Sequence, residues 1–85
     1  MNDVDRTRAI ELAAPLLRIS PAEASCDESA EIDGFYVWQP VRGGAQVLVG
    51  RDGALLYGNS SLDYGQMVAA YRTGRRTELR DPEGR

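Results

Sequence analysis

GFYVWQPVRGGAQVLVGRDGALLYG, residues 34–58, determines the architecture of this chain. The segment contains three runs rich in aromatic, branched and other apolar residues, which favour β-strands, at 35–39, 45–49 and 54–57. Glycines at 43 and 44 offer one turn, and Asp52-Gly53 offers a second, because Asp-Gly supplies the positive φ that tight hairpins need. Three strands joined by short turns predict an antiparallel meander.

A helix is predicted on each side of this segment. Before it, apolar residues recur near the helical period from Val4 to Leu17, and Asp3 or Asp5 can accept hydrogen bonds from the first turn. Pro15 removes a helical N–H, so we expect a kink or a short break near Ala14 and an end before residue 20. Residues 20–33 have no clear period and are predicted to form a loop, with at most one helical turn at 21–25.

The second helix follows the strands. Ser60 and Asp63 have the spacing of a capping box, and Gly74 is placed to end the helix in a left-handed conformation. Four residues fall at i, i+3, i+4 and i+7 and predict the buried face of the helix: Tyr64, Met67, Val68 and Tyr71.

The predicted fold class is α+β, with the order helix, three-stranded antiparallel meander, helix. We expect a two-layer sandwich with both helices on one sheet face, a single domain over residues 1–74, and a flexible charged C-terminal tail over 75–85. Strand alternation places Phe35 and Val37 on one face and Tyr36 and Trp38 on the other. Both faces carry apolar side chains, so the face without helices would meet water or a partner.

Composition excludes several kinds of chemistry. The 85 residues include no His, and Cys26 is the only cysteine, so imidazole catalysis, a cysteine zinc site and an internal disulfide are excluded. All ten cations are Arg, so lysine chemistry is absent as well. No carboxylate pair or metal-ligand spacing is recognisable. We therefore predict a non-enzymatic protein with no catalytic residues, no metal and no cofactor.

Charge and hydropathy also restrict the partners. Thirteen acids against ten Arg give a net charge of −3, which disfavours non-specific nucleic-acid binding. The start of the chain is acidic, unlike a signal peptide, and no apolar run is long enough to span a bilayer. We expect a cytoplasmic protein that binds neither nucleic acid nor membrane.

Two groups of residues are candidates for binding a protein partner. Tyr36 and Trp38 share one strand face and belong to the types that dominate interface energetics, although they can instead pack beneath a helix. An acidic segment supplies a second group, which can either contact a basic partner or form a solvated loop: Asp27, Glu28, Glu31 and Asp33.

The middle of the chain resembles the bacterial immunity protein 35 family. The resemblance rests on Gly34-Phe35-Tyr36-Val37-Trp38, on the second and third strands with their Asp52-Gly53 turn, and on the helix that follows Ser60, and it covers roughly residues 34–74. It implies a small cytoplasmic α+β protein that neutralises a toxin by occluding it, without catalytic residues of its own.

A second interpretation comes from a different functional class. The uncovered sheet face or an edge strand can instead join two copies of the chain in a structural homodimer, or serve a small chaperone-like protein.

Overall fold

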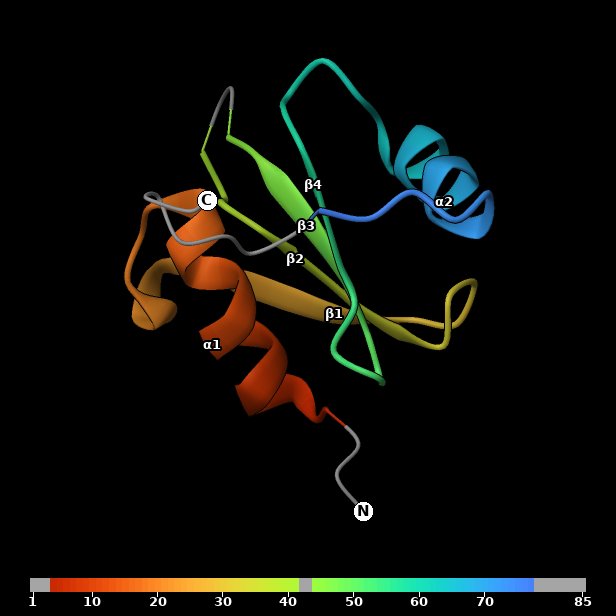
Figure 1. Cartoon of the computed structure of the whole chain (residues 1–85). Coiled ribbons are helices and arrows are strands. Elements are labelled where there is room, and N and C mark those ends of the chain that lie inside the picture. Colours follow the sequence, from red (N-terminus) through yellow and green to blue (C-terminus); the bar gives the residue numbers. More distant parts are fainter. Residues whose placement is uncertain (1–3, 42–43, 78–85) are drawn as a thin grey trace, which may run out of the picture.

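The computed structural model describes residues 4–41 and 44–77 and has a four-stranded antiparallel sheet between two α-helices (Figure 1). The strands lie in the order β1-β2-β3-β4. In chain order the elements are α1 (Arg6–Leu17), a 3-10 turn η1 (Pro21–Glu23), β1 (Ser25–Ser29), β2 (Gly34–Trp38), β3 (Gln46–Gly50), β4 (Leu55–Gly58) and α2 (Tyr64–Arg72).

The predicted meander corresponds to β2, β3 and β4. Val37 lies opposite Val47, and Val47 lies opposite Tyr57, so one register runs across the three strands. At the β3–β4 turn Gly53 has φ +90°, and Asp52 Oδ1 accepts a hydrogen bond from the Ala54 amide at 3.0 Å. The prediction of a turn at Asp-Gly is confirmed.

A fourth strand, β1, occupies part of the predicted loop over residues 20–33. Its sequence Ser-Cys-Asp-Glu-Ser has little intrinsic preference for a strand, so the prediction of a loop here was wrong. Tertiary pairing compensates, because β1 is matched to β2 from Ser25 opposite Trp38 to Ser29 opposite Gly34. Asp33, at φ +55°, completes the turn between the two strands.

The two helices cover opposite faces of the sheet, so the prediction of two layers with both helices on one face was also wrong (Figure 1). Every residue of β3 is buried, and its side chains alternate between the two faces. Val47 and Val49 pack in a core with α1, whereas Leu48 packs with Met67 and Tyr71 of α2. A central strand that is apolar on both faces needs cover on both.

Helix α1 begins and ends close to the predicted positions. Asp5 is its N-cap and accepts a hydrogen bond from the Arg8 amide at 2.9 Å. The helix continues through Pro15 to Leu17 and stops at Arg18, which has φ +60°. The expected break is absent because Pro15 lies in the last turn, on the exposed side, where few helical hydrogen bonds follow it.

Helix α2 is capped by Asp63 and not by Ser60. Asp63 Oδ1 accepts from the Gln66 amide at 2.7 Å, and Gln66 Oε1 accepts from the Asp63 amide at 2.9 Å. This reciprocal pair is a capping box one turn later than predicted. Gly74, at φ +101°, ends the helix as expected.

The chain beyond α2 returns to the sheet. The Thr77 amide donates to the Leu55 carbonyl, and Thr77 Oγ1 accepts from the Tyr57 amide at 2.8 Å. Residues 75–77 of the predicted tail therefore reach the outer edge of β4. Residues 78–85 lie outside the described residues.

Candidate interaction surface

Helix α2 leaves part of its sheet face open. It packs mainly on β3 and β4 and leaves Tyr36 and Trp38 of β2 only half-buried. Their rings stack with centroids 5.0 Å apart and planes at 24°. Tyr64, at the start of α2, meets Tyr36 edge to face at 4.8 Å. We call Tyr36, Trp38 and Tyr64 the aromatic surface; all three are half-buried.

A buried glutamine fixes the border of the aromatic surface. Gln46 is 5% exposed, and its Oε1 accepts from the Tyr36 hydroxyl at 2.8 Å. Its Nε2 donates to the carbonyls of Asn59, at 3.0 Å, and Leu62, at 2.6 Å. Partial burial raises the pKa of Tyr36. One side chain thus fastens the β4–α2 loop to the sheet.

Gln46 was not among the residues predicted to form the site. A signal was present, because Gln46 is the polar residue in the run Ala45-Gln46-Val47-Leu48-Val49. A polar side chain inside a buried strand needs hydrogen-bond partners, and the aromatic hydroxyls of neighbouring strands are natural ones.

A second hydrogen-bond chain joins β1 to α2. The Tyr64 hydroxyl donates to Glu31 Oε1 at 2.7 Å, so in its 2.6 Å contact with Ser29 the serine Oγ is the donor. The hydrogen bond from Tyr64 lowers the pKa of Glu31. Burial, more than its hydrogen bonds, raises the pKa of Tyr64. The arrangement holds a carboxylate at the edge of the aromatic surface.

Four of the six predicted partner-binding residues come together on this face. Tyr36 and Trp38 form the stack, Asp27 lies opposite Tyr36 in the strand register and is exposed, and Glu31 is bound to Tyr64.

The other two predicted residues lie elsewhere. Glu28 is paired with Phe35, whose side chain belongs to the α1 core, so Glu28 faces the other side of the sheet. Asp33 lies in the β1–β2 turn, where its Oδ1 is 2.9 Å from Arg51 Nε. The prediction treated the acids as one loop, but strand alternation in β1 separates neighbouring carboxylates.

The aromatic surface borders a shallow hollow of about 280 Å³ between the β2–β3 turn and the β4–α2 loop. Val41 and Leu62 line it and are 58% and 38% exposed. Asp63 is the charged side chain among the described residues that line it. The lining of the hollow is therefore mainly polar, with the two apolar side chains Val41 and Leu62 exposed in it and the carboxylate of Asp63 beside them.

Little in the described part of the chain supports a reactive thiol, a metal site or a membrane-spanning helix. Cys26 is half-buried on the α1 side, and burial raises the pKa of its thiol, which disfavours the reactive thiolate. Residues 4–41 and 44–77 hold no group of three metal-binding side chains. None of their helices is both long and apolar enough to cross a membrane.

Comparison with known proteins adds no relative. No family model matches the chain, and no curated protein or solved structure shows significant similarity to it.

Proposed function

We propose that this chain is a protein-binding domain whose partner covers the aromatic surface together with Asp27 and Glu31. The observation that supports the proposal is the incomplete cover of one sheet face: Tyr36 and Trp38 stack on β2 and stay only half-buried beside the start of α2. Tryptophan and tyrosine are the residues most enriched where interfaces derive their binding energy. A half-buried pair that is already stacked needs little ordering when a partner binds.

Charge indicates the kind of partner. Asp27, Glu31 and Asp63 surround the aromatic surface, and the whole chain carries a net charge of −3. A basic partner would be attracted to this face and oriented by it.

The same charges disfavour a homodimer through this face. A two-fold dimer places identical patches against each other, so carboxylates would oppose carboxylates.

Both sheet edges also carry obstacles to strand pairing. The Arg6 guanidinium donates to the Cys26 carbonyl of β1, and Thr77 occupies the outer edge of β4.

Within the class of protein-binding domains, we propose inhibition of a toxin by occlusion. The resemblance of residues 34–74 to bacterial immunity proteins suggests this role. Occlusion also agrees with a composition without His or Lys, because an inhibitor that covers a site needs no reactive groups. The partner would present a basic substrate site or its rim.

The test is affinity capture from the native cell with matched variants as bait. Trp38→Ala and Asp27→Asn alter the proposed interface. Tyr57→Ala and Glu28→Gln are the controls. Tyr57 lies opposite Val47 and faces α1, and Glu28, the next residue in the chain after Asp27, also faces the α1 side. Circular dichroism and thermal unfolding would verify that all four variants fold.

The expected result is a stoichiometric toxin-domain partner that both controls retain. Trp38→Ala should weaken its binding at least about tenfold, and Asp27→Asn should weaken it most at low salt, where exposed charges are least screened. If Trp38→Ala binds the partner as tightly as the unaltered chain does, the proposed surface would be refuted. Capture of the bait alone, with a dimer in light scattering, would favour the homodimer.

A further inference from the structure

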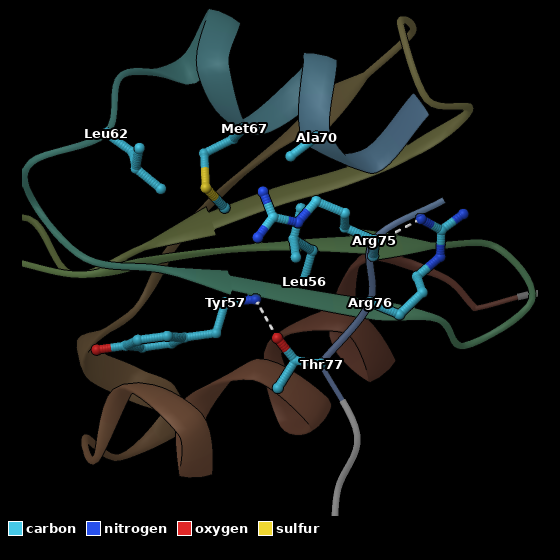
Figure 2. A pocket seen from close by; sticks show the side chains of 8 residues that line it. All are labelled: Leu56, Tyr57, Leu62, Met67, Ala70, Arg75, Arg76 and Thr77. Carbon is cyan, nitrogen blue, oxygen red and sulfur yellow. Dashed lines mark hydrogen bonds between the residues drawn. The ribbon is translucent and has the colours of Figure 1, made fainter. Parts of the chain in front are cut away.

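A second pocket lies between α2 and β4 (Figure 2). Leu62 lines both this pocket and the hollow beside the aromatic surface. The volume of the pocket is about 270 Å³, below the ~300–1,000 Å³ of pockets that hold drug-sized ligands. It has room for about one amino-acid residue. We call it the α2–β4 pocket; it is lined by Leu56, Tyr57, Leu62, Met67, Ala70, Arg75, Arg76 and Thr77.

The pocket has an apolar base and a cation above it. Leu56, Met67 and Ala70 form the base, and Figure 2 shows the Arg75 guanidinium extended over Leu56 toward Met67. Within residues 4–41 and 44–77 the Arg75 side chain makes no ion pair or hydrogen bond. An arginine in this position can bind a carboxylate with two parallel hydrogen bonds.

The neighbouring arginine is already engaged. Arg76 lies over the Tyr71 ring, 3.6 Å from its centroid, and its Nη1 donates to the Tyr71 carbonyl at 2.7 Å. In Figure 2 its side chain points away from Leu56. Arg75 is therefore the cation directed at the pocket.

One end of the pocket is closed by the chain itself. Thr77 forms hydrogen bonds with the Leu55 carbonyl and the Tyr57 amide, which are backbone groups on the outer edge of β4. On the side away from Thr77, α2 contributes Met67 and Ala70 to the apolar base (Figure 2). A peptide cannot run along β4 past Thr77, but the end of a peptide can enter beside Leu62.

From these contacts we infer that the α2–β4 pocket binds the carboxyl-terminal residue of a protein or peptide. An apolar final side chain would contact Leu56, Met67 and Ala70, and the terminal carboxylate would bind Arg75. In a terminal residue both groups branch from one Cα, which matches a cation placed directly over an apolar base. This site is separate from the proposed aromatic interface and does not depend on it.

The test is an NMR titration of the full ¹⁵N-labelled chain with three peptides. The first is acetyl-Gly-Ser-Gly-Val-Leu with a free carboxylate, and the second is the same peptide with a C-terminal amide. The third, acetyl-Gly-Leu-Glu-Gly-Ser-amide, carries its carboxylate within the chain. We expect the first peptide alone to shift the amide signals of Leu56, Leu62, Met67 and Arg75.

Two variants test the role of the cation. Arg75→Gln should weaken the free-carboxylate peptide about tenfold, as expected when a charge-assisted hydrogen bond is lost. Arg72→Gln makes the same charge change at the end of α2 but does not line the pocket, and should leave the affinity within about twofold. The inference would be overturned if no peptide binds, if the amidated peptide binds equally well, or if the peptide with the internal carboxylate is preferred. Equal losses of affinity in Arg75→Gln and Arg72→Gln would overturn it as well.

Discussion

Gln46 shows how one polar side chain can organise a surface. It lies in a strand whose residues are all buried, and its amide joins the Tyr36 hydroxyl to two carbonyls of the β4–α2 loop. The residue type alone marked it as unusual for a core strand. Its partners were not predictable, because Asn59 and Leu62 come close only once β4 and α2 have packed.

Replacing Gln46 with leucine should lower the free energy of unfolding by about 1–3 kcal/mol, because the Tyr36 hydroxyl and two carbonyls lose their partner. Urea unfolding followed by circular dichroism measures the change. Gln39→Leu is the matched control at a half-buried position, with an expected change within about 0.5 kcal/mol. Equal effects in the two variants would show that the hydrogen bonds of Gln46 contribute little.

Two glycines should respond in opposite directions to alanine. A Cβ on Gly34 would overlap the backbone of Val49 and Gly50, whereas a Cβ on Gly65 in α2 would meet only ordinary contact with Asp63. Gly34→Ala should destabilise the fold by at least about 2 kcal/mol, and Gly65→Ala should stabilise it by about 0.5 kcal/mol. Thermal unfolding would distinguish them, and a neutral Gly34→Ala would contradict the close β2–β3 approach.

At the scale of single elements, β1 is the strand that the sequence did not reveal. Its residues alternate between the two sheet faces because β2 aligns them: Cys26 packs toward α1, while Asp27 lies beside Tyr36. The β2, β3 and β4 strands were predictable, since their side chains carry the pattern themselves. A strand specified by its neighbour leaves little local signal, and this is why the acids were treated as one loop.

The pKa of Glu31 should depend on its hydrogen bond from Tyr64, which is part of the link between β1 and α2. The Tyr64 hydrogen bond holds the pKa of Glu31 below its ordinary value, so the link contributes stability above the unfolded-state pKa and loses it as pH falls through the folded-state pKa. In Tyr64→Phe the pKa of Glu31, measured by NMR titration, should rise toward the ordinary value. An unchanged pKa would exclude the hydrogen bond in solution.

The edge of β4 provides a test of the returning chain. Thr77→Val keeps the side-chain shape but removes the Oγ1 that accepts from the Tyr57 amide. Hydrogen exchange of the Tyr57 amide should accelerate about tenfold, while the amide of Leu48 in the central strand should keep its rate. Equal rates for Tyr57 in both proteins would indicate that Thr77 does not protect the edge.

Across the whole molecule, the surface arises because a short helix covers only part of a wide sheet. The alternation of β3 predicted two apolar faces, but the sequence did not show on which face each helix would pack. Helices α1 and α2 divide the faces between them, and α2 lies at the β3–β4 side (Figure 1). The β2 aromatics were therefore predictable as strand residues, whereas their partial exposure beside α2 depends on the complete fold.

Trp38, the only tryptophan in the chain, allows a direct test of whether a partner covers the aromatic surface. Its fluorescence should be quenched by acrylamide in the free protein, because the indole is only half-buried. In complex with the captured partner, used in a form without tryptophan so that only Trp38 emits, the quenching constant of Trp38 should fall several-fold, because the partner covers the ring. An unchanged quenching constant in a stoichiometric complex would show that the partner binds elsewhere and would contradict the account.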